Sequence, residues 1–232
     1  MISVIIPTFN EESHIQRTIQ GLFQYDKTKL IKEIIVVDGG STDNTLNVVK
    51  ALGVNFLISS QKGRSSQMNL GASVALGKVL YFLHADTTPP LNFSQDIENA
   101  IKNGYDAGCY RLSFDHNHWF LKANCWFTRF DIDAIRFGDQ SLFVDKQKFD
   151  EAGGFCKKHI VLEDHEFIKR LKKICKFTVI KKPVLTSARK YLENGIYKTQ
   201  VIFFSIFLMY KLGFSQQKLL STYKKLINQD KL

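Results

Sequence analysis

Ile34-Ile35-Val36-Val37-Asp38-Gly39-Gly40-Ser41-Thr42-Asp43 is the stretch that points most directly to the fold of this 232-residue chain. Its four apolar, β-branched residues predict a buried strand. The two glycines then indicate a turn, and Thr42 or Asp43 is placed to begin a helix whose apolar residues recur at helical spacing. The stretch therefore predicts a strand, a tight loop and a helix in succession.

The same alternation occurs on both sides of this stretch. The first apolar run is stopped by Pro7, and Asn10 is available as the cap of the helix that follows. The other elements expected in this part of the chain are a strand over 3–6, a helix over 15–23, a strand over 56–58, a helix over 65–76 and a strand over 79–83. Short strands separated by helices predict an α/β fold with a mostly parallel central sheet flanked by helices.

The pattern loosens after residue 105. The elements expected there are strands over 107–114 and 141–144, helices over 117–130 and 164–174, and C-terminal helices over 201–210 and 215–227. We therefore expect a main domain over 1–190, with a first half over 1–105 and a second over 106–190. A C-terminal helical appendage over 191–232 completes the chain.

Composition and charge limit the classes of protein to which the chain can belong. Hydrophobic residues make up 44% of it and charged residues 23%, which excludes intrinsic disorder and collagen-like repeats. The net charge of +10 favours anionic partners, but the basic residues are scattered and form no nucleic-acid module, so we expect no nucleic-acid partner. The four cysteines contain no CxxC pair, which favours a reducing interior. No basic leader precedes the first strand, so we expect cytoplasmic residence.

Polar residues at the ends of the predicted strands are the first candidates for a binding site, because ligands bind beyond the carboxyl ends of parallel strands. They include Thr8 and Asn10 after the first strand, and Asp38 after the second. The Asp38 carboxylate could accept a hydrogen bond from a nucleobase, and Gly39 allows close approach of the backbone. A helix cap with a turn is the alternative interpretation of this segment.

His84 and Asp86 follow the strand over 79–83. A carboxylate at this point can hold Mg²⁺ or Mn²⁺ on a diphosphate, since such cations need only one or two protein carboxylates. Asp86 could instead cap a helix near Pro89. For His84 two interpretations stay open: a buried, hydrogen-bonded imidazole, or a metal-ligating or supporting group.

Two further segments carry charge in a useful pattern. Gly63 and Arg64 form a glycine-basic turn that enters a helix, a combination that favours phosphate. Leu162-Glu163-Asp164-His165-Glu166 places three acids in five positions, and clustered like charges are typical of a carboxylate tuned as a general base. A solvated acidic helix start is the alternative interpretation.

These segments, in this order, resemble the family 2 glycosyltransferases with the GT-A fold. Ile5-Ile6-Pro7-Thr8-Phe9-Asn10-Glu11-Glu12 looks like the opening strand and loop of that family, and the block around Asp38 is similar to the one whose Asp contacts the base. His84-Ala85-Asp86 stands where the family carries its metal-binding DxD, with His84 in place of the first acid. Gly153-Gly154-Phe155 before Glu163-Asp164 resembles the acceptor-side block with the catalytic base. Gly39 stands where many relatives carry a second Asp.

A narrower resemblance is to a small bacterial subgroup described as radical-SAM/selenodomain-associated transferase 2. It rests on the segments Gly63-Arg64-Ser65-Ser66-Gln67-Met68-Asn69, Gly138-Asp139-Gln140 and Thr186-Ser187-Ala188-Arg189-Lys190-Tyr191.

The resemblance implies an inverting, metal-assisted sugar transfer from a nucleoside-diphosphate sugar to an acceptor hydroxyl. The first half of the main domain would bind the nucleotide and the second half the acceptor. UDP is the expected nucleotide, with GDP open, and a lipid-linked alcohol is among the candidate acceptors. Asp164 would be the base and Glu163 its tuning partner; Asp86 and His84 would bind Mn²⁺ or Mg²⁺; Asp139, Gln140 and Arg189 would lie on the acceptor side; and the nucleotide would contact Pro7, Thr8, Asn10, Glu12, Asp38, Gly39, Gly63, Arg64 and Asp86.

Two other functions are considered for the same residues. A nucleotidyltransferase would also place a metal and a nucleotide on such a sheet. It requires a basic, glycine-rich first loop, whereas the loop here reads Thr8-Phe9-Asn10-Glu11-Glu12. A non-catalytic sugar-nucleotide-binding homologue is the second, because His84 replaces an acid.

The apolar run over 201–210 lies between Lys198 and Lys211. At ten residues it is too short to cross a bilayer, which takes about 20. Either it is a core or subunit-contact helix, or the segment 196–214 lies peripherally on the inner face of a membrane with its lysines toward anionic headgroups.

Overall fold

The computed structural model describes residues 1–132 and 138–228. Its first half follows the predicted alternation, with β1 (Ile2–Thr8), α1 (Ile15–Tyr25), β2 (Ile31–Asp38), α2 (Thr45–Ala51), β3 (Asn55–Ile58), α3 (Arg64–Val74) and β4 (Val79–Phe82). The second half contains β5 (Thr87–Thr88), α4 (Phe93–Lys102), β6 (Ala107–Phe114), α5 (Trp119–Phe127), β7 (Leu142–Asp145), α6 (Lys146–Glu151), α7 (Glu163–Leu171) and β8 (Phe177–Thr186). Helices α8 (Arg189–Asn194), α9 (Ile196–Lys211) and α10 (Gln216–Leu226) follow.

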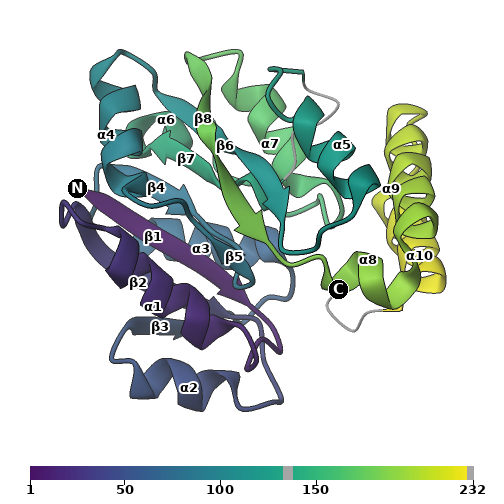
Figure 1. Ribbon diagram of the computed structural model, residues 1–232, viewed down its shortest axis with the longest axis horizontal. Helices are drawn as coiled ribbons and strands as arrows, with labels where there is room; N and C mark the ends of the chain where they lie inside the picture. Colours follow the sequence, from purple (N-terminus) through teal and green to yellow (C-terminus); the bar gives the residue numbers. More distant parts are fainter. Residues whose placement is uncertain (133–137, 229–232) are drawn as a thin grey trace.

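One sheet runs through both halves of the predicted main domain. Within the described residues it has eight strands in the order β3-β2-β1-β4-β7-β6-β8-β5. β3, β2, β1 and β4 are parallel, as expected, whereas β7 runs antiparallel to both β4 and β6 and β5 runs antiparallel to β8. The sheet is therefore mixed, and its four parallel strands carry the loops that follow Thr8, Asp38 and Phe82 to one edge (Figure 1).

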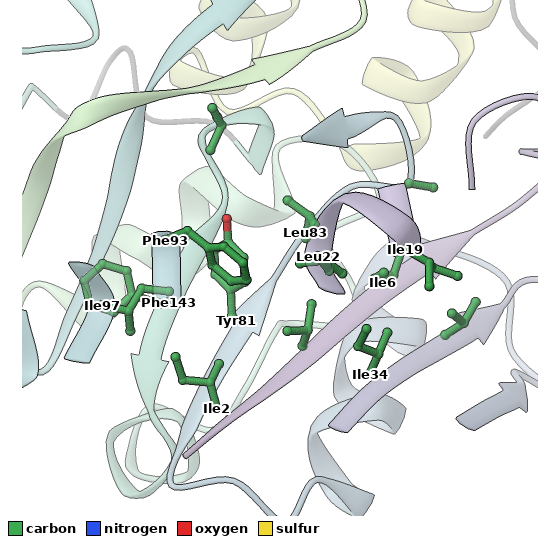
Figure 2. Close-up of a cluster of buried hydrophobic side chains, with 14 of the residues drawn as sticks. Ile2, Ile6, Ile19, Leu22, Ile34, Tyr81, Leu83, Phe93, Ile97 and Phe143 are labelled. Atoms are coloured by element: carbon green, nitrogen blue, oxygen red, sulfur yellow. The ribbon is translucent and has the colours of Figure 1, made fainter. Parts of the chain in front are cut away.

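The two faces of the sheet carry separate cores because successive side chains of a strand point to opposite sides. This alternation is visible in β2, where Ile34 and Val36 enter one core and Ile35 and Val37 the other. The first core is covered by α1, α2 and α4 and includes the residues in Figure 2. The second core is covered by α3, α6 and α7. Strands buried on both faces explain the continuous apolar runs in the sequence.

The predicted cap of one helix and the predicted start of another are wrong. α1 begins at Ile15 after His14, and Asn10 is not its cap, because Asn10 lies in the preceding loop with φ 53°. Phe23, expected on the apolar face of this helix, is 59% exposed. α2 begins at Thr45 rather than at Thr42 or Asp43, and the Asp43 carboxylate accepts a hydrogen bond from Thr45 N instead.

The C-terminal helices pack on the main domain through two small apolar clusters. α9 and α10 enclose Val161, which lies in the loop before α7. Tyr191 of α8 packs with Leu121 of α5 and Ala188. Among the described residues, no helix combines the length and the apolar character needed to cross a membrane.

Candidate active site

The loops after β1 and β2 are joined by a network of hydrogen bonds. Asp38 is completely buried, and its carboxylate accepts from Gly40 N and Ser41 N, each at 2.8 Å, and from the Ser41 hydroxyl. Thr8 lies opposite Asp38 in the strand register, and its carbonyl accepts from Gly39 N. The observed contacts of Asp38 therefore shape its own loop, which is the turn-forming role considered above, and its contact with a base stays a prediction.

Asn10 and Glu12 connect the same two loops. Asn10 Oδ1 accepts from Thr42 N at 2.9 Å, and Asn10 N donates to Ser41 Oγ at 2.9 Å. Glu12 Oε2 accepts from Asn44 N at 2.8 Å. With Pro7 paired to Val37 in the strand register, the predicted nucleotide residues of these two loops lie together at one edge of the sheet.

Arg64 begins α3 directly after Gly63, whose φ of 104° strongly favours glycine. The Arg64 side chain does not extend freely toward solvent, because its Nε lies 2.7 Å from Oε1 of Glu163. Glu163 is only 1% exposed, and neither of its carboxylate oxygens has a hydrogen-bond partner among the described residues, so its contact with Arg64 is an ion pair. The predicted phosphate-binding arginine and the predicted tuning acid therefore form a pair.

Asp164 lies beside this pair in the first turn of α7 and is 7% exposed. Burial, and next the negative charge of Glu163, raise the pKa of Asp164 from its ordinary 3.8 to about 6, against the opposing charges of Arg64 and His84. A carboxylate with a pKa near 6 is ionised at neutral pH and accepts a proton more readily than an ordinary aspartate. The arrangement suits a general base.

His84 and Asp139 form a second charged pair close to Asp164. His84 Nδ1 lies 3.1 Å from Asp139 Oδ1. Burial opposes the charged form of His84, but the hydrogen bond with Asp139, together with the negative charges of Asp139 and Asp164, outweighs it and raises the pKa of His84. Burial likewise opposes the charged form of Asp139. Its bond to His84 and the positive charges of His84, Lys190 and Arg64 together hold the pKa of Asp139 below its ordinary value, although its side chain is 48% exposed and solvent weakens the attraction. His84 is thus hydrogen-bonded, one of its two predicted roles.

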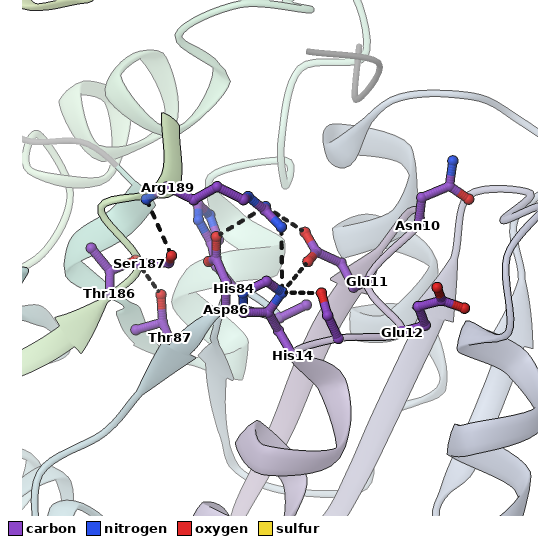
Figure 3. Close-up of polar contacts among 12 residues, drawn as sticks. Asn10, Glu11, Glu12, His14, His84, Asp86, Thr87, Thr186, Ser187 and Arg189 are labelled. Atoms are coloured by element: carbon purple, nitrogen blue, oxygen red, sulfur yellow. Dashed lines mark hydrogen bonds and ion pairs between the residues drawn. The ribbon is translucent and has the colours of Figure 1, made fainter. Parts of the chain in front are cut away.

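Arg189 lies between the carboxylate of Glu11 and that of Asp86, which stands in the same loop as His84 (Figure 3). Its Nη2 is 3.7 Å from Glu11 Oε1 and 3.7 Å from Asp86 Oδ2, and its Nη1 is 3.3 Å from His14 Nδ1. A small hollow beside it is lined in part by His14, Asp86 and Ser187. The pairing of β5 with β8 brings these groups together, since Thr87 and Thr186 share a hydrogen bond across 99 positions of sequence.

Two of the predicted acceptor-side residues, Arg189 and Gln140, make contacts within the protein, and their acceptor-side roles stay predictions. Arg189 contacts loops of the first half, because the turn after β8 carries it to Asp86. Gln140 is 2% exposed, and its side chain accepts a hydrogen bond from Cys109 within the sheet, so it is not presented to a substrate here. Glu11 and His14 were not predicted, because their place in the cluster depends on Arg189.

The donor groups present fit a cation that takes most of its ligands from a bound diphosphate. In the described part of the chain, no group of three or more His, Cys, Asp or Glu residues could hold a metal ion by itself. The carboxylates of Asp86 and Glu11 lie on either side of one guanidinium, which marks a point where positive charge is favoured. Mg²⁺ and Mn²⁺ are commonly held by one or two carboxylates together with phosphate oxygens.

Comparisons with solved structures confirm the fold. The mannosyltransferase PcManGT from Pyrobaculum calidifontis, in complex with GDP-Man and Mn²⁺, matches with a TM-score of 0.69 at 16% identity over 97% of this chain and 67% of that one. TarS 1–349 from S. aureus, in complex with UDP-GlcNAc, matches with a TM-score of 0.68 at 15% identity, over 97% of this chain and 71% of that one. The architecture is that of the GT-A glycosyltransferases, with C-terminal helices added.

Sequence comparisons agree with this architecture. A dolichyl N-acetyl-α-D-glucosaminyl phosphate 3-β-D-2,3-diacetamido-2,3-dideoxy-β-D-glucuronosyltransferase from Methanococcus voltae is 51% identical over 108 residues, or 44% of this chain and 33% of that protein. A dolichol-phosphate mannosyltransferase from Pyrococcus furiosus is 34% identical over 117 residues, or 45% of this chain and 31% of that protein. The chain thus spans about a third of the length of these relatives. The model of the family described as "Glycosyl transferase family 2" matches residues 3–156, and the chain belongs to that family.

Proposed function

We propose that this chain is an inverting glycosyltransferase that moves a sugar from a UDP-sugar to an acceptor hydroxyl. The observation that carries the proposal is the buried Asp164, whose pKa is raised to about 6 where the charges of Arg64, His84 and Asp139 also act on it. Family membership makes sugar transfer the activity to expect from such a base. The narrower resemblance to the small bacterial transferase subgroup remains part of this proposal.

The donor would lie across the loops after β1, β2 and β4. Its nucleoside would contact the joined loops of Pro7, Thr8, Asn10, Glu12 and Asp38–Gly39, and its diphosphate would lie near Asp86 and Arg189. Mn²⁺ or Mg²⁺ would be held by Asp86 and Glu11, and when bound it would supply Lewis-acid stabilisation of the leaving diphosphate. His84 would support this loop through Asp139 rather than bind the cation. Solved relatives in complex with GDP-Man and Mn²⁺ or with UDP-GlcNAc support a donor of this class.

Asp164 would act on the acceptor. Its carboxylate takes the proton from the acceptor hydroxyl as the oxygen attacks the anomeric carbon on the face opposite the diphosphate. The bond from that carbon to the diphosphate oxygen breaks as the new bond forms, so the anomeric configuration inverts. A general base of this kind supplies about 10²–10⁴-fold in rate.

Glu163 would keep Asp164 tuned. Its carboxylate pairs with Arg64 at 2.7 Å. Its negative charge raises the pKa of Asp164, which makes Asp164 a stronger proton acceptor than an ordinary aspartate. Glu163 is therefore a positioning and tuning residue in this proposal, and Asp164 is the base.

A lipid-linked alcohol or phosphate is the acceptor class that the relatives favour. Those from Methanococcus voltae and Pyrococcus furiosus are named for dolichyl and dolichol-phosphate substrates. A further relative from Proteus mirabilis, 26% identical over 133 residues, is named for undecaprenyl phosphate. Each of these names belongs to the protein that carries it, and for this chain a polyisoprenoid-linked acceptor is our inference.

The first prediction tests the base. Asp164→Asn removes the proton acceptor with little change in volume, so transfer should fall by about 10²-fold or more while the affinity for nucleoside diphosphate stays within about twofold. Radiolabelled transfer from UDP-sugars and GDP-sugars with Mn²⁺ measures the first quantity, and isothermal titration with UDP the second.

Asp150→Asn is the matched control, because Asp150 is exposed on α6. Transfer by Asp164→Asn at the wild-type rate would show that another group is the base. If the wild-type chain binds nucleotide but transfers no sugar to any acceptor, the non-catalytic homologue considered above is the better description.

A further inference from the structure

Helix α9 is apolar on two opposite faces. Its inner face includes Ile202 and Ile206, which are buried against α10 and the loop before α7. Its outer face carries Tyr197, Val201, Phe204, Leu208 and, at the C-cap, Leu212, which are between 48% and 67% exposed. Their spacing of three and four residues aligns them along one side of the helix. A helix that is apolar all round is normally buried on every side. The outer face of α9 is exposed instead, so it lacks a covering partner among the described residues.

Helix α5 extends this surface. Trp119 is 66% exposed, Trp126 46% and Phe127 50%. The two helices meet at Tyr197, whose ring centroid lies 6.4 Å from that of Trp119 and 5.0 Å from that of Phe120. We call Trp119, Trp126, Phe127, Tyr197, Val201, Phe204, Leu208 and Leu212 the aromatic face; α5 and α9 lie side by side in Figure 1.

The two segments that carry the aromatic face have charge of one sign. Residues 116–130 and 194–228 contain no aspartate or glutamate, and of the acids that border them, Asp115, Asp131 and Glu193, Asp131 is paired with Lys172. Both segments carry exposed cations, among them Lys122 of α5, Arg129 shortly after it, and Lys198, Lys211 and Lys218 along α9 and α10. The Arg129 guanidinium lies 4.3 Å from the Trp126 ring, so its charge is held at the edge of the apolar surface. An apolar centre with a positive rim is complementary to an anionic surface that has an apolar interior.

We propose that the aromatic face docks on the surface of an anionic phospholipid bilayer. Tryptophan and tyrosine favour the boundary between headgroups and acyl chains, and the lysines would reach the phosphates. At 16 residues α9 is too short to cross the hydrocarbon, so it would lie in the plane of the interface. A second copy of the chain is a poorer partner, because a symmetric contact would bring two positive rims together.

The same helix contacts the helix that carries Asp164. The ring of His165, the next residue along α7, lies 5.2 Å from that of Phe207 and 5.8 Å from that of Tyr210. Gln216 of α10 accepts from Ile160 N and Val161 N in the loop before α7. Docking would therefore hold the base about one helix diameter, roughly 10–12 Å, from the lipid. This step rests on the proposed function, and it favours an acceptor carried by a membrane-anchored molecule.

Vesicle flotation of the full chain tests the docking without donor or acceptor. We expect the chain to float with phosphatidylcholine vesicles that contain phosphatidylglycerol, and to float about tenfold less with phosphatidylcholine alone or in high salt. The double substitution Phe204→Glu with Leu208→Glu should lower the partition coefficient by about tenfold or more. Phe23→Glu is the matched control, because Phe23 is 59% exposed on α1, away from the aromatic face, and it should bind as the wild type does.

Circular dichroism and thermal unfolding check that each variant is folded, which the exposure of the substituted residues favours. The proposal is overturned if the wild type does not float with anionic vesicles, or if the double variant floats as well as the wild type. It is also overturned if sedimentation velocity without lipid shows a dimer that the double substitution dissociates. Because flotation needs no substrate, vesicle binding without sugar transfer would contradict the proposed function and leave the docking surface intact.

Discussion

At the scale of single residues, the site places an acid where ionisation is costly. The raised pKa of Asp164 means that its charged form is less stable in the folded chain than in the unfolded one. Its contribution to stability is complete below the ordinary pKa of 3.8 and is lost as pH rises through about 6. A shift of this size corresponds to about 3 kcal/mol of folding free energy at neutral pH. Such a cost is expected at a functional position and hard to explain at a structural one.

The second prediction concerns the neighbour that causes part of this shift. Glu163→Gln removes a negative charge beside Asp164, so the pKa of Asp164 should fall and the acidic limb of the kcat/KM profile should move to lower pH by about half a unit or more. A pH series of transfer rates measures the limb.

Glu166→Gln is the control for that experiment. Glu166 lies in the same first turn of α7, but it pairs with Arg170 and is not among the charges that act on Asp164. An acidic limb at the same pH in Glu163→Gln and in the wild type would remove Glu163 from the tuning role.

At the scale of elements, α3 is pressed closely against the parallel strands. A Cβ added at Gly71 would lie 2.5 Å from Ile5 Cγ2 and 3.1 Å from Val37 Cγ2. The third prediction is that Gly71→Ala lowers the free energy of unfolding by about 1–3 kcal/mol, although alanine is normally the better helix former. Urea denaturation measures the change.

Ser73→Ala, at an exposed position of the same helix, is the control and should change stability by less than about 0.5 kcal/mol. A Gly71→Ala variant as stable as the wild type would show that α3 can move away from the sheet without cost.

The elements that the sequence predicts well are those with uninterrupted apolar runs. β1, β2 and β4 are buried on both faces and can be recognised from those runs. β8 cannot, because Lys181, Lys182 and Pro183 interrupt its pattern near a register shift against β6, and β5 has only two residues. The antiparallel direction of β7 depends on pairing between distant segments, which local periodicity does not report.

The predicted site shows the same division. Acids that follow an apolar run, such as Asp86 and Asp164, could be selected from the sequence because their strand or helix places them at the sheet edge. Glu11 and His14 could not, because their place in the cluster depends on contacts with Arg189, which is distant in sequence. The pairing of Arg64 with Glu163 could not be predicted either, since α3 and α7 lie about a hundred residues apart in sequence and are brought together by packing in the second core.

At the scale of the whole molecule, the proposed donor site combines several loops of the first half with Arg189, which belongs to the second half. A ligand that contacts all of them should stabilise the fold as a unit, because it binds only when the loops are together. The fourth prediction is that UDP with Mn²⁺, at about 100 times its Kd, raises Tm by roughly 5–10 °C, and that Asp86→Ala removes the Mn²⁺-dependent part of this increase. Differential scanning fluorimetry measures both.

Asp150→Ala on α6 and addition of a chelator are the controls for this measurement. The substitution should leave the full shift in place, and the chelator should reproduce the loss seen in Asp86→Ala. An equal shift with and without Mn²⁺ in the wild type would mean that Asp86 contributes no metal ligand.

The bond between Thr87 and Thr186 has a consequence for how the protein is made. Ribosomes release a chain from its amino end, so the early strands can begin to pack while the later ones are still being synthesised. Arg189 reaches the loop of Asp86 only after β8 has emerged and joined β5. A nascent chain would therefore hold an open, incomplete nucleotide pocket until translation has passed its last strand, and binding would begin only after that point.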